Sequence, residues 1–220
     1  MKIITINIRG LGNATKWRYI NELNRKEGAG MICIQETKMK NINKEKCFKL
    51  WDDNNVEWLH KEAMEGAGGI LTVWHKNVFV CERNIVGKGF MVLIGRNKEK
   101  DIPIVVVNVY LACTLKDKCN MWEEIINIRK TEGCKTWCMV GDFNAVRKPD
   151  ERKGVSIGHA NKKEILGFNE FIDKIEMLEI PFVGRKYTWY RPNGNAKSRI
   201  DRIFVSDKWL EHWPGYKQYI

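Results

Sequence analysis

Two polar side chains follow an apolar run in the second half of the sequence. The stretch WCMVGDFNAV, residues 137–146, begins as a buried strand would and then places Asp142 and Asn144 two residues apart. A carboxylate can act as a general base, and a carboxamide can orient water or a phosphate oxygen without titrating. Alone, the pair also fits an Asx-type turn. It predicts a site only if other strands deliver polar groups to the same place.

Other strand-like runs carry polar side chains in a similar way. Asn7 follows KIITI, Glu36 ends MICIQE, and VVVNVY presents Asn108 and Tyr110. Asp201 lies inside the otherwise apolar run RIDRIF. Each residue by itself fits a turn or a half-buried position, but α/β folds build their sites from polar groups at the carboxyl ends of strands. The set as a whole therefore indicates one site.

This set of oxygen donors suits a hard cation. Carboxylates and carboxamides without clustered His or Cys favour Mg²⁺ or Mn²⁺ over zinc. Mg²⁺ takes one or two carboxylates and keeps water and substrate phosphate as its other ligands. A carboxylate such as Asp142 can serve as the base for a water nucleophile, and Asn144 can orient that water. Phosphodiester hydrolysis is the chemistry that these residue types predict.

The charge balance points to a polyanionic partner. The 220 residues carry 38 Lys and Arg against 27 Asp and Glu, a formal net charge of +11 with a pI near 9.3. Nucleic acid or an anionic membrane surface fits this balance, and so does a generic basic protein. Hydrophobic residues make up 44% and charged residues 30%, so we expect a globular chain.

Several other function classes lack their motifs. GxxxxGK[ST] does not occur, and GAGGI at residues 66–70 precedes a strand-like run, which excludes a dinucleotide fingerprint. The seven cysteines form no CxxC pair, and several lie in apolar runs, so we expect reduced thiols and an intracellular protein. No stretch of 18 apolar residues exists, so we expect no membrane span.

The order of elements predicts an α/β fold. Helical spacing occurs between Lys16 and Lys26, after Thr114, and from residue 161 to 178, where Asn161 and Glu164 resemble a capping box. Helices thus separate strands early and late, whereas the middle is consecutive strands. This mixture predicts two sheets packed face to face with helices outside. The strand-like runs are KIITI and residues 31–36, 56–61, 69–74, 78–86, 90–96, 102–111, 137–143, 186–191 and 199–206.

The motifs occur in an order that resembles a known superfamily. ITINIRGL, ICIQETK, GAGGILTVW, VVNVY, VGDFNAV and SRIDRIFVS look like the motifs of the endonuclease/exonuclease/phosphatase superfamily, the fold of apurinic endonucleases and DNase I. ERKG at residues 151–154, FNEFID and YTWYRPNGNAKSRIDRIFVSDKW are more specific. They resemble the endonuclease domain of a plant LINE-type, non-LTR retrotransposon. The resemblance covers nearly the whole chain.

The resemblance implies a four-layer α/β sandwich of two packed mixed β-sheets flanked by helices, in one domain spanning residues 1–220. It implies metal-dependent nicking of target DNA for retrotransposition by target-primed reverse transcription. A reverse transcriptase in the parent polyprotein and action in the nucleus follow from the same resemblance.

The resemblance also implies a role for each candidate residue. Glu36 would be the main ligand of Mg²⁺ or Mn²⁺, and Asn7 would lie at the metal and the phosphate. Tyr110 would contact the scissile phosphate. Asp142 would position or deprotonate the attacking water, and Asn144 would orient it.

The sequence departs from the family pattern in two places. The family Asp that Asp201 matches supports a catalytic His within a later SDH motif, and no SDH motif occurs here. His212 lies too early and in a helix-like context to replace it. We therefore expect a chain truncated before its last strand, with weak activity or none. Arg9 stands where some members carry an acid, which leaves Glu36 as the clearest metal ligand.

A basic hairpin is predicted near the end of the chain. RKYTWYRPNGNAKSRIDR reads as strand, loop and strand, and PNGN has the chemistry of a hairpin turn. Arg185, Lys186, Trp189, Arg191 and Lys197 are candidate DNA contacts, because loops near the site enter a groove in related nucleases. The same residues also fit a solvated basic hairpin.

Two alternatives to a nuclease stay open. A phosphatase for a small phosphoester such as an inositol phosphate would use the same fold and metal site. A non-catalytic DNA-binding module would keep the fold without the chemistry and would show salt-sensitive binding without cleavage.

Overall fold

The computed structural model describes residues 1–64, 66–133, 135–154 and 162–220. The chain forms two compact units, Met1–Tyr110 (unit 1) and Leu111–Ile220 (unit 2), which are described in turn. Asn161, where the sequence pattern starts a helix, lies outside the described residues, as does Cys134. No helix in the described ranges is long and apolar enough to cross a membrane.

A mixed four-stranded sheet forms the first layer of unit 1. Its order is β1-β2-β4-β3, in which β1 is parallel to β2 and the other pairs are antiparallel. Every residue of β2 is buried, as expected for an apolar central strand. The strands are β1 (Ile3–Asn7), β2 (Met31–Gln35), β3 (Val56–Met64) and β4 (Ala67–His75).

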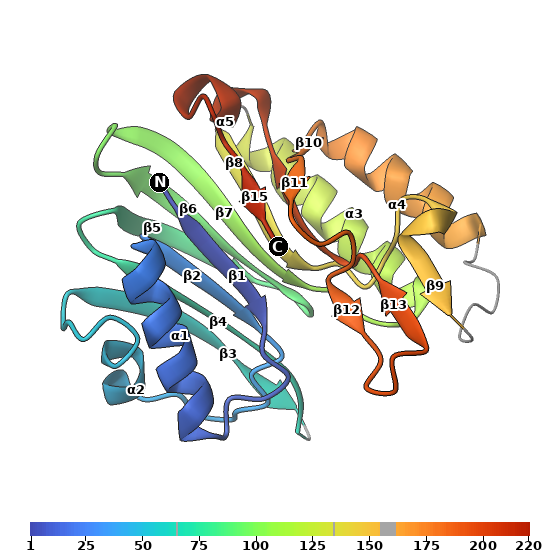
Figure 1. Ribbon diagram of the computed structural model, residues 1–220. Helices are drawn as coiled ribbons and strands as arrows, with labels where there is room; N and C mark the ends of the chain where they lie inside the picture. Colours follow the sequence, from blue (N-terminus) through green and yellow to red (C-terminus); the bar gives the residue numbers. More distant parts are fainter. Residues whose placement is uncertain (65, 134, 155–161) are drawn as a thin grey trace. The chain divides into compact units, whose positions relative to one another are not determined.

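Two helices cover the outer face of this sheet (Figure 1). The helix α1 (Ala14–Glu27) confirms the expected helix. Asn13 caps its N-terminus, and the Asn13 side chain accepts a hydrogen bond from the Thr15 amide. Trp17 of α1 packs in one apolar cluster with Ile34 of β2. The second helix is α2 (Lys44–Phe48).

Three antiparallel strands form the second layer of unit 1: β5 (Phe79–Val86), β6 (Phe90–Asn97) and β7 (Ile102–Tyr110). Asn108 of β7 is fully buried between the two layers. Its Oδ1 accepts a hydrogen bond from Gln35 Nε2 at 2.6 Å, and its Nδ2 donates to Thr72 Oγ1 at 3.0 Å. This polar contact joins β7 to β2 and β4, so the expected face-to-face sandwich is confirmed within unit 1.

Unit 2 is built on β8 (Thr136–Asp142), which pairs antiparallel with β14 (Asp201–Val205). The short strand β10 (Leu178–Glu179) pairs with the other edge of β14. Two helices pack together beside these strands (Figure 1). They are α3 (Leu115–Glu132) and α4 (Lys162–Ile175), where Trp122 of α3 stacks on Phe168 and Phe171 of α4.

A three-stranded antiparallel sheet contains the expected hairpin. It consists of β12 (Trp189–Tyr190), β13 (Ala196–Ser198) and β9 (Arg152–Gly154), with β13 in the centre. The hairpin is confirmed, although its first strand is shorter than the run 186–191. The remaining elements are the 3₁₀ helix η1 (Pro149–Glu151), the strand pair β11 (Phe182–Val183) with β15 (Gln218–Tyr219), and α5 (Asp207–His212).

Strand β14 corrects one expectation from the sequence. Asp201 is its first residue and does not lie inside it. The strand is also not otherwise apolar, because Arg202 is fully buried and forms ion pairs with Glu151 and, at 2.5 Å, with Glu179. Tertiary partners supply this charge compensation, so no local pattern in the run 199–206 indicates it.

Candidate active site

The metal-site candidates of unit 1 lie at the carboxyl ends of two adjacent strands. Asn7 is the last residue of β1 and pairs in register with Gln35, the last residue of β2. Glu36 follows directly, and its carbonyl accepts a hydrogen bond from the Gly10 amide at 2.6 Å. The parallel pairing therefore brings Asn7 and Glu36 to one edge of the sheet, as the sequence predicts.

The backbone at this edge is held in an uncommon conformation. Glu36 and Arg9 have φ values of 55° and 51°, in the left-handed region that side chains other than Gly, Asn and Asp rarely adopt. Such outliers persist only where surrounding contacts hold them, and they gather at functional sites. Asp52, Asp101 and Glu176 adopt the same region elsewhere in the chain, so the conformation at Glu36 is compatible with a site but does not by itself locate one.

Both candidate ligands already have partners in their own unit. Asn7 Oδ1 accepts a hydrogen bond from the Arg9 amide at 3.2 Å, so the Asx-type turn weighed for this residue is present. The half-buried Glu36 carboxylate lies 3.0 Å from Lys38 Nζ. Because the Lys38 side chain is 45% exposed, a cation at Glu36 can displace the ammonium into solvent.

The glycines of GAGGI have a structural explanation in unit 1. The amides of Thr37 and Lys38 donate to the carbonyls of Gly69 and Gly68, so the segment after Glu36 runs against β4. A Cβ at Gly69 would lie 2.2 Å from Thr37 Oγ1, and φ there is +86°. These glycines therefore make room for the backbone that presents Glu36.

Tyr110 also belongs to unit 1. It is the last residue of β7, its amide donates to the Gly89 carbonyl at 2.8 Å, and it is neither buried nor fully exposed. Asn108, two residues earlier, is a structural residue of the interior. The two side chains share one face of the strand, and they differ because Asn108 lies between the layers whereas Tyr110 lies at the end of β7.

The remaining catalytic candidates meet in unit 2. Antiparallel pairing places Asp201, at the start of β14, directly opposite Asp142, at the end of β8. Asp142 Oδ1 accepts a hydrogen bond from the Asn144 amide at 2.8 Å. The Asx-type turn weighed for this pair is therefore present, with the Asn144 backbone amide bound to the Asp142 carboxylate.

Asn144 is fixed at three atoms. Its φ is 47°, which Asn tolerates better than most residues. Its Nδ2 donates to the Leu111 carbonyl at 2.7 Å, and its own carbonyl accepts from Lys118 Nζ at 2.5 Å. Within the part of the chain that the structure describes, one Nδ2 hydrogen and the Oδ1 of Asn144 are the groups left for a ligand.

Sequence reasoning missed the lysine that holds this loop. Lys118 is 2% exposed, and its ammonium forms an ion pair with Glu164 of α4. A signal was available, because Lys118 falls at helical spacing with Trp122 and Ile125 on the buried face of α3. A lysine on an apolar stripe indicates a buried partner.

Sequence reasoning also missed the support of Asp201. Thr188 Oγ1 accepts hydrogen bonds from the amides of Ile200 and Asp201, each at 3.1 Å. The hairpin is thereby connected to the start of β14. Thr188 lies inside the strand-like run 186–191, and nothing in that run indicates this contact.

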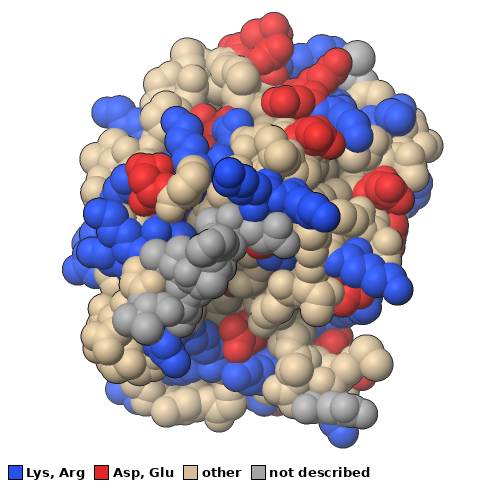
Figure 2. Space-filling view, turned by 90° about the vertical axis from the view of Figure 1, so that its right-hand side faces the viewer, with Lys and Arg blue, Asp and Glu red and all other residues tan. Residues whose placement is uncertain are grey.

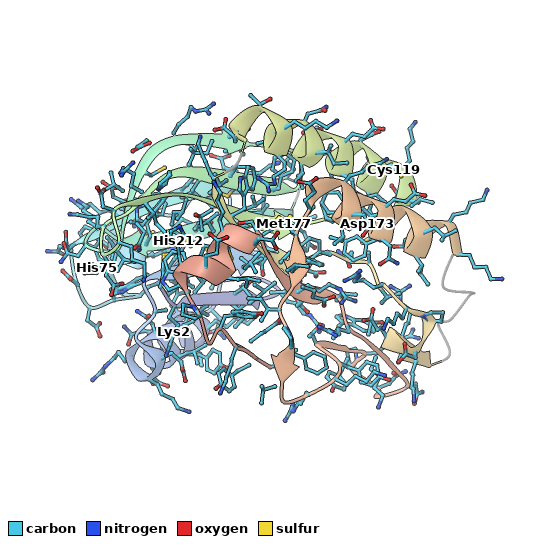
Figure 3. All side chains as sticks on the ribbon, turned by 90° about the horizontal axis from the view of Figure 1, so that it is seen from above. Lys2, His75, Cys119, Asp173, Met177 and His212 are labelled. Atoms are coloured by element: carbon cyan, nitrogen blue, oxygen red, sulfur yellow. The ribbon has the colours of Figure 1, made fainter. Side chains whose placement is uncertain are left out.

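His212 is placed as the sequence context indicates. It is the last residue of α5 (Figure 3), and its ring lies edge-on to Trp213 with 6.1 Å between ring centroids. The predicted DNA contacts all lie in or beside the hairpin of unit 2. Lys186 forms an ion pair with Asp150 at 2.6 Å, and Lys197 lies over the ring of Tyr187.

Two mixed β-sheets flanked by helices define the molecule as an α/β protein, in agreement with the solved structures that it resembles. The chain belongs to the endonuclease/exonuclease/phosphatase family, whose model matches residues 4–216. The members of this family are nucleases and phosphatases, and they are in general metal-dependent hydrolases. No curated protein sequence matches the chain.

Three solved structures illustrate the likeness. The AP endonuclease LMAP from Leishmania major superposes with a TM-score of 0.70 at 16% identity, covering 94% of this chain and 79% of that one. The endonuclease domain of TRAS1, a telomere-specific non-LTR retrotransposon, gives 0.66 at 14%, covering 95% and 86%. A mannosyl-6-phosphatase from Bacteroides thetaiotaomicron gives 0.64 at 12%, covering 93% and 85%. At these identities the likeness establishes the fold.

Proposed function

We propose that this chain is a metal-dependent DNA endonuclease that nicks DNA by hydrolysing a phosphodiester. The observation that carries the proposal is the arrangement in unit 2, where Asp201 lies opposite Asp142 and the Asn144 amide binds the Asp142 carboxylate. Two carboxylates and a carboxamide at one strand end suit the handling of an attacking water.

The donor set of unit 1 fits a magnesium or manganese ion. No group of three or more His, Cys, Asp or Glu side chains gathers within the described residues, so a zinc-type cage is absent there. Glu36 offers one half-buried carboxylate next to the carboxamide of Asn7, and Mg²⁺ takes such a small protein set together with water and phosphate. When bound, the ion would neutralise charge on the phosphate.

The other residues divide the work on the substrate. Asp142 takes the proton of the attacking water, and Asn144, fixed by Leu111 and Lys118, orients that water. Tyr110 donates its hydroxyl to a phosphate oxygen. Asp201, which matches the family Asp that supports a catalytic His, lies directly opposite Asp142.

DNA is the substrate that the charge favours. The net charge is +11, and the hairpin of unit 2 carries Arg185, Arg191 and Lys197. Among the similar structures are an AP endonuclease and the endonuclease domain of a non-LTR retrotransposon. The specific motifs of the hairpin region support an origin in a LINE-type element of the plant kind. We accordingly propose that the nick serves target-primed reverse transcription, that the parent polyprotein contains a reverse transcriptase, and that the protein acts in the nucleus.

A plasmid-nicking assay tests the proposal. The chain is incubated with supercoiled plasmid in Mg²⁺, in Mn²⁺ and in EDTA, beside the variant Asp142→Ala. We expect slow nicking, because the sequence holds no SDH motif, and we expect EDTA and Asp142→Ala to abolish it. DNA binding without Asp142-dependent nicking would instead identify a non-catalytic binding module.

A phosphatase for small phosphoesters is the second candidate, because a mannosyl-6-phosphatase shares the fold. Mannose 6-phosphate and an inositol phosphate are offered to the same preparation, with and without excess duplex DNA. Metal-dependent release of phosphate that DNA does not inhibit, in a preparation that leaves plasmid intact, would overturn the nuclease proposal.

A further inference from the structure

The sheet β12-β13-β9 aligns three side chains in one row. In its register Tyr190 of β12 lies opposite Lys197 of β13, and Lys197 lies opposite Lys153 of β9. Residues directly opposite one another in antiparallel strands project from the same face, so these three side chains share one face. We name Tyr190, Lys197 and Lys153 the basic row.

The burial of neighbouring residues shows which face is the outer one. Ala196 and Ser198, on either side of Lys197 in β13, are buried at 6% exposure each. Tyr190 is 42% exposed and Lys153 is exposed. The basic row therefore points outward, in accord with the side-chain alternation of a strand.

The opposite face carries a different set. Trp189 lies opposite Ser198, and Ser198 lies opposite Arg152, whose Nε donates to Ser198 Oγ at 3.3 Å. The predicted DNA contacts Trp189 and Lys197 thus project from opposite faces. A single flat ligand on this sheet contacts one of them only.

Strand β9 is built to approach β13 closely. Gly154 has a φ of +114°, and a Cβ there would lie 1.9 Å from the carbonyl oxygen of Asn195. Only glycine fits such a close approach. The ERKG segment therefore places Lys153 beside the hairpin through a specific backbone requirement.

The position of the Lys197 ammonium is restrained. Its Nζ lies 4.8 Å from the centroid of the Tyr187 ring. The Nζ of Lys186 lies 5.9 Å from the same centroid. Tyr187 is 7% exposed, and its hydroxyl donates to the Asp150 carbonyl at 3.3 Å. A cation–π contact leaves the N–H groups of Lys197 available to an anion.

We propose that the basic row binds the phosphate backbone of duplex DNA, an inference that rests on the proposed nuclease function and extends its DNA contacts to β9. Adjacent strands lie about 4.8 Å apart, so two long lysine side chains reach neighbouring phosphates, and the Tyr190 hydroxyl can donate to the backbone as well. A strong anion fits this row better than a lipid surface, since the row offers a single aromatic ring and no aliphatic face for insertion.

The surroundings of the row agree with a polyanionic ligand. Figure 2 views the molecule from the side on which β9, β13 and α4 lie in Figure 1, and Lys and Arg gather in broad patches there, with Asp and Glu between them. Lys162 and Lys163, at the start of α4, are also exposed.

The test measures binding without cleavage, so its outcome is independent of catalysis. A labelled duplex is titrated with the protein in EDTA at salt concentrations from about 50 to 200 mM. The double variant Lys153→Gln/Lys197→Gln should bind roughly tenfold more weakly, and the slope of log K against log salt should shrink by about 1.8, or about 0.9 per phosphate contact. Tyr190→Phe should weaken binding at every salt concentration without changing this slope.

A charge-matched control separates the row from net charge. Lys130→Gln/Lys174→Gln removes two exposed lysines from α3 and α4, and it should leave the slope nearly unchanged. Equal effects of the two double variants would overturn the proposal. So would a row variant that loses binding to phosphatidylserine vesicles while it keeps full affinity for DNA.

The nuclease proposal stands or falls separately. If the row variant binds DNA normally and the unmodified chain nicks plasmid, the proposal for the basic row is refuted and the nuclease proposal stands. If the unmodified chain never nicks plasmid and the row variant loses DNA binding, the nuclease proposal is refuted and the proposal for the basic row stands.

Discussion

Asp142 and Asp201 lie directly opposite each other across the antiparallel pair β8 and β14. Asp142 is 3% exposed and Asp201 is half-buried, so two like charges face each other with limited access to solvent. Like charges directly opposite in a sheet destabilise it. In the proposed function both carboxylates serve the site, so stability and activity are opposed at this pair, and the opposition can be measured.

The variant Asp142→Asn should be more stable and less active than the parent chain. The carboxamide keeps an oxygen that can accept from the Asn144 amide, so the turn is retained while the base is lost. We expect roughly 0.2–1 kcal/mol of added stability from the lost repulsion. Nicking should fall at least about 100-fold.

Urea unfolding and plasmid nicking on the same preparations check this prediction. The control is Asp173→Asn, an exposed carboxylate of α4 (Figure 3), which should change neither quantity. A variant that is both less stable and fully active would contradict the assignment of Asp142.

Removal of the Glu36 carboxylate should abolish the response to metal. In the parent chain we expect Mg²⁺ to compete with Lys38 for Glu36 and to stabilise the folded state by binding to it. Glu36→Gln should therefore lose both the Mg²⁺-dependent rise in Tm and the nicking. The exposed Glu22 of α1 provides the matched control Glu22→Gln, in which the rise in Tm should persist. An undiminished Mg²⁺ response in Glu36→Gln would place the metal elsewhere.

The buried lysine of α3 should be important for stability. Lys118→Met leaves the Glu164 carboxylate without its partner and frees the Asn144 carbonyl, and loss of one member of a buried pair costs about 3–5 kcal/mol. Adding Glu164→Gln should recover part of this loss. Lys116→Met, on an exposed position of the same helix, should stay within about 0.5 kcal/mol of the parent chain. Urea unfolding of the four proteins measures the differences, and equal losses for Lys118→Met and Lys116→Met would refute the role.

Thiol labelling should separate the cysteines by burial. Burial raises the pKa of Cys33 to about 12 and that of Cys47 to about 12, so neither forms a thiolate in the native protein at pH 8. Cys113 and Cys119 are exposed and should react first with iodoacetamide. Mass spectrometry of peptides locates the label, and unfolding in urea should make all sites reactive. Rapid native labelling of Cys33 would show that β2 opens readily.

His60 should reduce the stability of the protein in mild acid. Burial lowers the pKa of His60 below its ordinary value, and its Nε2 has no hydrogen-bond partner among the described residues. As the pH falls through about 6.5, the unfolded chain takes up a proton that the folded chain resists, so stability is lost in that direction. Above that pH both states are neutral at this residue, and the effect vanishes.

A comparison of thermal unfolding at pH 7.5 and 5.5 tests the role of His60. The variant His60→Gln should show a smaller fall in Tm between these values than the parent chain. His212→Gln, at the end of α5, controls for removal of a histidine ring. Identical pH dependence in His60→Gln and the parent would contradict the prediction.

Much of the fold follows from the sequence because strand and helix patterns are local. Runs rich in Val, Ile, Thr and aromatic residues predicted β1 to β8 to within a few residues, and helical spacing predicted α1 and α3. The short strands β9, β10, β11 and β15 were not predicted, since strands of two or three residues form only where a partner is supplied by tertiary structure. The boundaries of β12 were overestimated for the same reason.

The sequence by itself determined the chemical inventory: a carboxylate and carboxamides at strand ends in unit 1, the Asp142 and Asn144 pair in unit 2, and an excess of positive charge. Tertiary structure alone decided which of these meet. Antiparallel pairing placed Asp201 opposite Asp142, and burial turned Lys118 and Arg202 into internal supports. The reason is physical, since residue types and local periodicity are written along the chain, whereas register and compensation of buried charge depend on partners distant in sequence.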